Sequence, residues 1–166
     1  LIRVRCGIKV NIKGLENLPD SGPVIIASNH QGIFDIPVLQ GLLPTQFRWV
    51  SKESLFRIPV IGWTMTLAGY ISINRESATK SLRSLKQAAE RIKAGTSVLI
   101  FPEGTRGPDS VLLPFKRGIF MIGTKSGVPL VPISISGTSN IMKDHSVWIR
   151  PTRVEVTVHR PIDTNG

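Results

Sequence analysis

The stretch VIIASNHQGIFDIPVLQGLL, residues 24–43, joins a continuous apolar run to a segment with helical spacing. The run at residues 24–28 predicts a strand buried on both faces, because no polar residue alternates with the apolar ones. After a polar loop, Phe34, Val38 and Leu42 recur at the spacing of one helix face, and a proline then ends the segment. Such a strand, loop and helix form the repeating unit of an α/β sheet.

Apolar runs and helical segments alternate along the rest of the chain. The segment 77–94 is the clearest further helix, because its apolar residues fall on one face and Gly95 follows its end. That face holds Leu82, Leu85, Ala89 and Ile92. We predict one α/β domain over residues 1–166, with a mostly parallel central sheet and helices on both faces.

The remaining elements follow from the same patterns. We expect an edge strand in residues 4–14 and a closing hairpin or strand pair from residues 147–150 and 153–160. Further strands are expected in residues 47–52, 70–73, 97–101 and 128–137. Further helices are expected in residues 53–69 and 116–127.

The chain is strongly basic. Its 21 Lys and Arg residues outnumber 11 Asp and Glu residues, giving a formal net charge of +10. That charge attracts nucleic acid, anionic lipid or phosphorylated small molecules. The basic residues form no long block and only 6% of the residues are aromatic, which disfavours a nucleic-acid partner.

Several classes of site lack a signature in the sequence. Cys6 is the single cysteine, so no disulfide forms within the chain, and a buried thiol in a reducing compartment is the expected state. The uncharged run 58–74 is shorter than the about 20 apolar residues of a membrane span. No cluster of His, Cys, Asp and Glu has metal-ligand spacing, so we expect no metal and no cofactor. Phosphate-binding loops and nucleophile elbows are missing as well.

His30 and Asp35 stand out in the first loop. An imidazole is a suitable base near neutral pH, and a carboxylate on its other nitrogen fixes the tautomer. A spacing of five does not align on one straight helix, so we place His30 in the loop and Asp35 in the first helical turn. Taken alone, this spacing leaves open whether His30 is a base or a structural histidine. For His145 and His159 we favour a structural role.

Polar clusters follow three of the predicted strands. Parallel strands carry their ligands at their carboxyl ends, where we expect His30, Arg75 and Arg106 to converge. Arginine suits phosphate because its planar fork makes paired hydrogen bonds. Two arginines beside a base would form a phosphate pocket, whereas the alternative is a pair of surface arginines bonded to strand-end carbonyls.

Four stretches together resemble the glycerolipid acyltransferase family, in particular its 1-acylglycerol-3-phosphate acyltransferases. NHQGIFD at residues 29–35 matches the first motif, Asn-His-x4-Asp, and GYISINR at 69–75 resembles the second, with Ser72 where an aromatic is usual. FPEGTR at 101–106 is similar to the third and VPISI at 131–135 to the fourth. The similarity extends from about residue 10 to residue 163.

The resemblance implies roles for individual residues. His30 would deprotonate the acceptor hydroxyl while Asp35 holds the imidazole, and the hydroxyl would attack an acyl thioester directly. Backbone N–H groups around Glu103 and Gly104 are the expected donors to the oxyanion. The expected substrate-binding residues are Arg75, Glu103, Gly104, Thr105, Arg106 and Lys116. The expected acyl-pocket or structural residues are Asn29, Gly69, Phe101, Pro102, Val131 and Pro132.

The resemblance also implies partners and a location. The donor would be acyl-CoA or acyl-carrier protein, and the acceptor 1-acylglycerol 3-phosphate, with glycerol 3-phosphate or a lyso-aminolipid as alternatives. The lipid substrate and basic surface predict membrane association at the cytoplasmic face. We expect an N-terminal anchoring segment and the C-terminal end to lie outside these 166 residues. A non-catalytic basic module that binds anionic membrane or nucleic acid is the alternative from another class, and it leaves FPEGTR unexplained.

Overall fold

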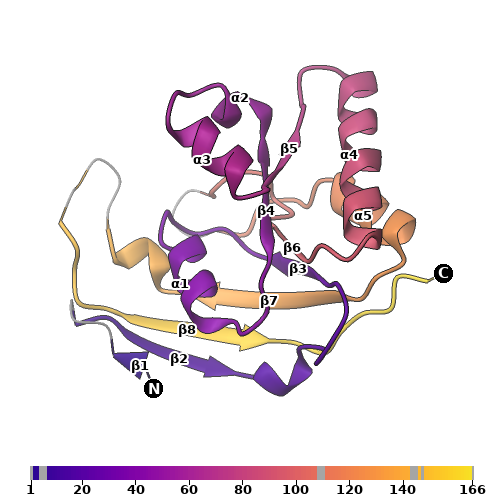
Figure 1. The fold of residues 1–166 in the computed structure, drawn as a ribbon. Coiled ribbons are helices and arrows are strands. Elements are labelled where there is room, and N and C mark those ends of the chain that lie inside the picture. The colour runs from indigo at the N-terminus through magenta and orange to yellow at the C-terminus, as the bar shows by residue number, and fades with distance from the viewer. Residues whose placement is uncertain (1, 4–6, 108–110, 143–145, 147, 166) are drawn as a thin grey trace.

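Eight strands form one sheet in the order β1-β2-β8-β7-β3-β6-β4-β5 (Figure 1). This computed structural model describes residues 2–3, 7–107, 111–142, 146 and 148–165, so the predictions for Cys6 and His145 lie outside the described residues. The strands are β1 Ile2–Arg3, β2 Lys9–Lys13, β3 Ile25–Ser28, β4 Arg48–Lys52, β5 Ile71–Ile73, β6 Val98–Ile100, β7 Leu130–Ser136 and β8 Arg153–Val158. The α-helices are α1 Asp35–Leu42, α2 Glu53–Phe56, α3 Ile61–Leu67, α4 Ala78–Lys93 and α5 Gly118–Ser126. Two 3₁₀ turns, η1 Leu15–Asn17 and η3 Thr138–Asn140, complete the described elements.

The sheet is mostly parallel, as predicted. β3 pairs in parallel with both β6 and β7, and β4 does so with both β5 and β6. β2 pairs in parallel with β8, while β1 with β2 and β7 with β8 are antiparallel. The α/β class predicted from the apolar strands is therefore confirmed.

Three predictions about individual elements are wrong in detail. The predicted edge strand, β2, lies between β1 and β8. The predicted closing hairpin does not form, because β8 pairs with β7 and β2, and residues 148–150 carry no strand. The single helix predicted for residues 53–69 is divided into α2 and α3 at Pro59 and Val60, where the proline lacks the N–H that would continue the helix.

Two apolar layers cover the two faces of the sheet. Consecutive side chains of a strand point to opposite faces, so Ile26 packs into one core cluster and Ile25 into the other. The first cluster includes Leu39 from α1, and the second includes Ile92 from α4 and Ile122 from α5. Figure 1 shows α4 and α5 together on one side of the sheet. Helices therefore lie on both faces, and this explains why the strands are continuous apolar runs.

The helix α4 begins and ends where the sequence indicates. The side chain of Ser77 accepts a hydrogen bond from the Lys80 N–H, which is an N-cap, and Gly95 follows with a φ of 108°. Ala89 and Ile92 are buried as expected, and Ala88 is buried beside them. Leu82 is 40% exposed, so the packed face of α4 is shifted from the predicted one.

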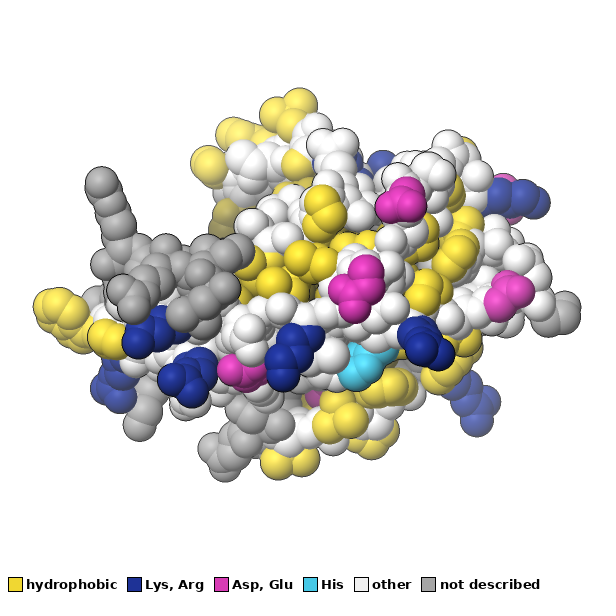
Figure 2. Space-filling model, turned by 90° about the horizontal axis from the view of Figure 1, so that it is seen from below, with side chains coloured by type: hydrophobic (Ala, Val, Ile, Leu, Met, Phe, Trp, Pro, Cys, Tyr) yellow, Lys and Arg dark blue, Asp and Glu magenta, His cyan; other side chains and the backbone are white. Residues whose placement is uncertain are grey.

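The surface mixes charge with apolar side chains. Figure 2 shows Lys and Arg side chains spread over one face of the molecule, with hydrophobic and uncharged side chains between them. On this face the basic residues form no single continuous patch. Within the described part of the chain, no helix has the length and apolar character needed to cross a bilayer.

Candidate active site

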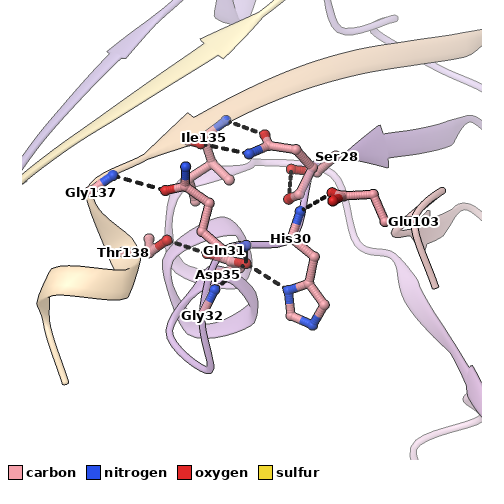
Figure 3. Close-up of polar contacts among 10 residues, drawn as sticks. Ser28, His30, Gln31, Gly32, Asp35, Glu103, Ile135, Gly137 and Thr138 are labelled. Atoms are coloured by element: carbon pink, nitrogen blue, oxygen red, sulfur yellow. Dashed lines mark hydrogen bonds and ion pairs between the residues drawn. The ribbon is translucent and has the colours of Figure 1, made fainter. Parts of the chain in front are cut away.

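The loop after β3 brings the two residues of the first motif into contact. His30 Nδ1 and Asp35 Oδ2 are 2.7 Å apart (Figure 3), and Asp35 is fully buried while the His30 side chain is 17% exposed. A carboxylate only accepts hydrogen bonds, so Nδ1 carries the ring proton in a neutral His30. The other ring nitrogen, Nε2, is then an acceptor, and in Figure 3 it points away from Asp35. This is the tautomer that a general base requires.

The buried carboxylate of Asp35 is fully compensated. Its Oδ2 also accepts hydrogen bonds from the N–H groups of Gln31 (2.7 Å) and Gly32 (2.9 Å), and its Oδ1 accepts one from the Thr138 hydroxyl. Asp35 lies in the first turn of α1, where a negative charge is favoured. These donors offset the cost of burying the charge and fix the carboxylate in place.

The His30 ring also has a fixed orientation. It stacks on the Phe101 ring, with 3.9 Å between the centroids and 14° between the planes. Phe101 directly follows β6, the strand beside β3. Stacking on one side and a hydrogen bond at Nδ1 together restrict both rotations of the imidazole. Phe101 was predicted as an acyl-pocket or structural residue, and the structure places it against the candidate base.

Asn29 joins the same loop to the sheet. Its side-chain amide donates to the Ile135 carbonyl (2.9 Å), and its side-chain carbonyl accepts from the Ile135 N–H (2.8 Å). Two hydrogen bonds therefore hold β7, the strand that pairs with β3, to the residue before His30. Gln31 makes a similar contact, because its side-chain oxygen accepts from the Gly137 N–H at 3.1 Å. The two residues that flank His30 are therefore both anchored to β7 or to the residue that follows it.

Glu103 connects the first and third motifs. Its carboxylate is buried and accepts hydrogen bonds from the backbone N–H groups of His30 (2.7 Å) and Leu113 (2.8 Å). Glu103 therefore ties together two loops that are far apart in sequence. Each carboxylate oxygen holds one backbone donor, so the side chain positions these loops, and the predicted role of Glu103 in substrate binding stays a prediction.

Gly104 forms a tight turn after Glu103. Its N–H donates to the Phe101 carbonyl at 3.0 Å, so this N–H is occupied and does not fit the oxyanion role expected of it. Its φ is 75°, and a Cβ atom here would lie 3.1 Å from Arg75 Nη1. The turn therefore requires glycine for its backbone conformation and for the close approach of Arg75.

Arg75 reaches this turn from the end of β5. Its Nη1 donates to the Gly104 carbonyl at 2.8 Å. The expected convergence of the three strand ends is thus found for His30, Arg75 and the 101–104 turn. The hydrogen bond to a backbone carbonyl matches the alternative prediction, in which this arginine is bonded to a carbonyl near a strand end. The Arg75 side chain also lines a cavity, as the phosphate-binding prediction requires.

The cavity beside Arg75 has a volume of about 430 Å³. Arg75 and Lys116 line it as exposed cations, and Ser77 and Ala78 bring the N-terminus of α4 to its wall. Glu76 also lines it, and its carboxylate lies 3.6 Å from Arg57 and from Lys80. The buried part of the lining is apolar and comes from Ile73, Ile100, Ile119 and Ile122. Two cations and a helix N-terminus outweigh the single carboxylate of Glu76 and attract an anion, and the apolar lining suits a hydrocarbon chain. Phe101 lines this cavity and stacks on His30, so the cavity adjoins the candidate base.

Comparison with known proteins decides the family. A family model described as Acyltransferase matches residues 9–136, which include the loop of His30 and Asp35, Arg75 and the 101–106 turn. The chain belongs to this acyltransferase family. The predicted resemblance is therefore confirmed.

Curated relatives of this acyltransferase chain are named as acyltransferases as well. It is 44% identical over 156 residues to a chloroplastic 1-acyl-sn-glycerol-3-phosphate acyltransferase of Brassica napus, covering 93% of this chain and 45% of that protein. It is 31% identical over 161 residues to the human 1-acyl-sn-glycerol-3-phosphate acyltransferase beta, covering 96% of this chain and 58% of that protein. The chain thus spans about half the length of these curated relatives.

A solved structure has the same fold. The 1-acyl-sn-glycerophosphate acyltransferase PlsC of Thermotoga maritima superimposes with a TM-score of 0.81 at 34% identity. The match covers 95% of this acyltransferase chain and 63% of the PlsC chain. This structural likeness supports the α/β architecture derived above.

Several predicted site residues of the acyltransferase chain lie outside the cavity. Thr105 and Arg106 are exposed, and neither is among the residues that line it. Val131 is buried in the core on the α1 side, and Pro132 pairs with Ala27 in the β3–β7 ladder. The predicted pocket role of Val131 and Pro132 finds no counterpart in the cavity, whereas Pro102 does line it.

Gly69 precedes β5, at the other end of that strand from Arg75. It has a φ of 72° at the turn between α3 and β5, and its carbonyl accepts from Arg91 at 2.8 Å. Its role is therefore structural, one of the two roles considered for it.

Two polar residues that hold the site were not predicted. Thr138 contacts Asp35 across 103 positions of sequence, and no local pattern indicates such a contact. Asn74 precedes Arg75, and its side chain donates to Glu53 of α2 and accepts from the Glu76 N–H. The hydrogen bond from Arg57, and then that from Asn74, lower the pKa of the Glu53 carboxyl below its ordinary value. Asn74 thereby holds the end of β5 where Arg75 begins.

The described residues contain no group of three or more His, Cys, Asp or Glu side chains able to hold a metal ion. The expectation that the chain needs no metal or cofactor stays a prediction.

Proposed function

We propose that this chain carries the catalytic site of an enzyme that moves a fatty acyl group from a thioester to the free hydroxyl of 1-acylglycerol 3-phosphate, giving phosphatidate. The observation that carries the proposal is the 2.7 Å contact between His30 and Asp35 beside a cavity with two cations and an apolar lining. The relatives named above act, by their names, on 1-acylglycerol 3-phosphate, and they support this acceptor.

The chemistry begins with a proton transfer. His30 Nε2 takes the proton of the acceptor hydroxyl as its oxygen attacks the thioester carbonyl carbon, and a tetrahedral intermediate forms. The Asp35 carboxylate stabilises the imidazolium produced in this step. The carbon–sulfur bond then breaks, and His30 returns the proton to the departing thiolate. The products are an ester and a free thiol, and the protein forms no covalent intermediate.

The acceptor would be held at its phosphate. Arg75 and Lys116 supply positive charge at the cavity, and the N-terminus of α4 adds the positive end of the helix dipole. The apolar lining would hold a hydrocarbon chain of one of the two substrates. Binding at the phosphate orients the free hydroxyl, which turns a collision of two molecules into a reaction within one complex.

The donor and the location belong to the same proposal. Acyl-CoA or acyl-carrier protein would supply the thioester. A lysophospholipid acceptor and a net charge of +10 support action at an anionic membrane surface, and the single cysteine is in keeping with the cytoplasmic face.

One experiment tests the proposal and the choice of acceptor. The purified chain is incubated with acyl-CoA and a panel of acceptors, namely 1-acylglycerol 3-phosphate, glycerol 3-phosphate and a lyso-aminolipid, and products are identified by mass spectrometry. Phosphatidate from the first acceptor is expected. A product only from one of the others would change the substrate, and no transfer to any acceptor would contradict the proposal.

A further inference from the structure

The unit formed by α2 and α3 has an unusually apolar exterior. Three side chains at helical spacing lie outward, with Val60 63%, Trp63 67% and Leu67 88% exposed. Ile58 and Ile61 add to the same stretch at 41% and 50%. We call these five residues the α2–α3 surface. A helix of a soluble domain normally turns polar side chains outward, and α3 carries no charge at all.

The backbone fixes this orientation. Gly62 packs so closely on the end of α2 that a Cβ atom here would lie 2.0 Å from the Phe56 carbonyl oxygen. Gly62 and Met65 are therefore the buried side of α3, and its apolar exterior cannot rotate inward without breaking this contact.

The tip of the unit is strained. Val60 has a φ of 66° and a ψ of −56°, and the Ile61 N–H donates to the Pro59 carbonyl at 2.7 Å. This is a γ-turn of the rare kind with positive φ, an unfavourable conformation for a β-branched residue. The turn places the side chain of Val60, which is 63% exposed, at the tip of the loop.

Arginines lie near both ends of this apolar stretch. Arg57 precedes it, but its charge is balanced by ion pairs with Glu53 and Glu76. At the other end, Arg91 donates to the carbonyl of Gly69 just after α3, and Arg48 lies beside the same glycine. In the described part of the chain, neither Arg48 nor Arg91 pairs with a carboxylate. The sequence has no Asp or Glu between Glu53 and Glu76. Apolar side chains with a tryptophan, with no acidic residue among them and two arginines at one end that have no carboxylate partner, match the boundary between anionic headgroups and acyl chains.

The surface is connected to the candidate site. Glu53 of α2 accepts from the Asn74 side chain, and Asn74 adjoins Arg75 of the cavity. Arg57 adds contacts to Glu53 (2.9 Å) and Glu76 (3.6 Å). The α2–α3 unit is thus fastened to the segment that carries the predicted phosphate binder, whereas α4 and α5 lie apart from it (Figure 1).

We propose that the α2–α3 surface docks onto an anionic phospholipid bilayer and inserts Val60, Trp63 and Leu67 below the headgroups. The inference rests on the proposed function in one respect, since docking there would bring a membrane-held acceptor to the cavity beside Arg75. Binding to the bilayer itself requires no catalysis.

Vesicle binding provides the test. The 166-residue chain is sedimented with vesicles of phosphatidylcholine alone and of phosphatidylcholine with phosphatidylglycerol, neither containing a substrate. The combined variant Val60→Ser, Trp63→Ser, Leu67→Ser is expected to lower partitioning into the anionic vesicles by about tenfold or more, because it removes most of the inserted apolar area. Phe120→Ser is the matched control, because Phe120 is 58% exposed on α5 and does not line the cavity. It is expected to bind like the unchanged chain.

Further measurements separate this proposal from the proposed function. Lipids brominated near the headgroup are expected to quench Trp63 fluorescence in a variant whose other tryptophans, Trp49 and Trp148, are replaced by Phe.

His30→Ala is expected to bind vesicles normally even if it is inactive. The triple variant is expected to lose transfer to a vesicle-embedded acceptor and to keep transfer to a water-soluble short-chain acceptor. Circular dichroism and thermal unfolding check that each variant is folded.

Three outcomes would overturn docking. One is an unchanged chain that does not bind anionic vesicles. Another is a triple variant that binds them as tightly as the unchanged chain. The third is a concentration-dependent dimer, seen by analytical ultracentrifugation, that the triple substitution abolishes without any change in vesicle binding; this would assign the surface to a second copy of the chain.

Discussion

The backbone N–H of His30 donates a 2.7 Å hydrogen bond to the buried carboxylate of Glu103. A residue of the third motif therefore positions the backbone of the candidate base, while its other oxygen holds Leu113. Asp35 controls the imidazole of the same histidine at Nδ1. The loop conformation and the ring orientation of His30 thus depend on two different carboxylates.

Glu103→Ala is expected to lower both stability and turnover. It leaves the N–H groups of His30 and Leu113 without their acceptor, at a cost of about 1–3 kcal/mol each. Glu103→Gln keeps one acceptor oxygen and is expected to recover part of kcat. Urea unfolding and steady-state kinetics check both variants. Equal kcat for the Gln and Ala variants, with both fully folded, would contradict a positioning role.

Asp35→Asn separates the electrostatic role of Asp35 from its structural one. The amide oxygen can replace Oδ2, and the amide N–H₂ can donate to the Thr138 hydroxyl, so the hydrogen bonds have acceptable replacements. The negative charge that stabilises the imidazolium is lost, and kcat is expected to fall by about 10²-fold or more. Thermal unfolding is the accompanying measurement. A folded Asn variant with kcat near that of the unchanged chain would show that the charge has no catalytic role.

Gly104→Ala is expected to weaken acceptor binding. A Cβ atom at this position would lie 3.1 Å from Arg75 Nη1, so the guanidinium must move. Gly22→Ala is the control, since Gly22 has a similar φ of 83° and open space around its Cβ position. Both variants should lose about 1–2 kcal/mol from the positive φ, but only Gly104→Ala should raise the KM for the acceptor. An equal KM in the two variants would contradict the importance of this contact.

Substitutions of Arg75 and Arg106 are expected to change the acceptor KM by different amounts, although the sequence analysis predicts the same phosphate-binding role for both. Arg75 lines the cavity and Arg106 does not, so Arg75→Ala should raise the acceptor KM by about tenfold, and Arg106→Ala should raise it less. Arg75→Lys keeps the charge without the planar fork and should lie between the unchanged chain and the Ala variant. Initial rates with each substrate varied in turn measure both KM values. A larger effect from Arg106→Ala would contradict the assignment of the phosphate to the cavity lined by Arg75 and would favour Arg106, which the sequence analysis also predicts as a phosphate binder.

Local sequence patterns predict much of this fold. The unit of β3 and α1 and the helix α4 have their apolar spacing and caps within a few residues, and those features are visible without coordinates. The break between α2 and α3 could have been predicted from Pro59, because a proline ends a helix by its missing N–H. The partners of β8 could not, because its pairing with β2 and β7 joins distant segments.

The candidate site likewise contains local contacts that the sequence predicts and long-range contacts that it does not. The contact between His30 and Asp35 is local, and it was predicted from their spacing together with the resemblance to the acyltransferase motif. The position of Arg75 follows from the rule that strand ends share one edge. The burial of Glu103 and the contact of Thr138 with Asp35 depend on how distant loops meet. A motif indicates which residues are special, whereas only the assembled sheet distinguishes a side chain that lines the cavity from one that holds a loop.

The central claim is that His30 acts as the base in acyl transfer. Its most direct test is the rate of phosphatidate formation from acyl-CoA and 1-acylglycerol 3-phosphate, measured for the unchanged chain, His30→Ala and His159→Ala. His159 is a matched control, because it is an exposed histidine whose Nε2 contacts Ser134 at 2.8 Å, away from the cavity. We predict that His30→Ala lowers kcat by about 10²- to 10⁴-fold while remaining folded, and that His159→Ala leaves it within about twofold. A folded His30→Ala variant that retains kcat within about tenfold of the unchanged chain would contradict the claim.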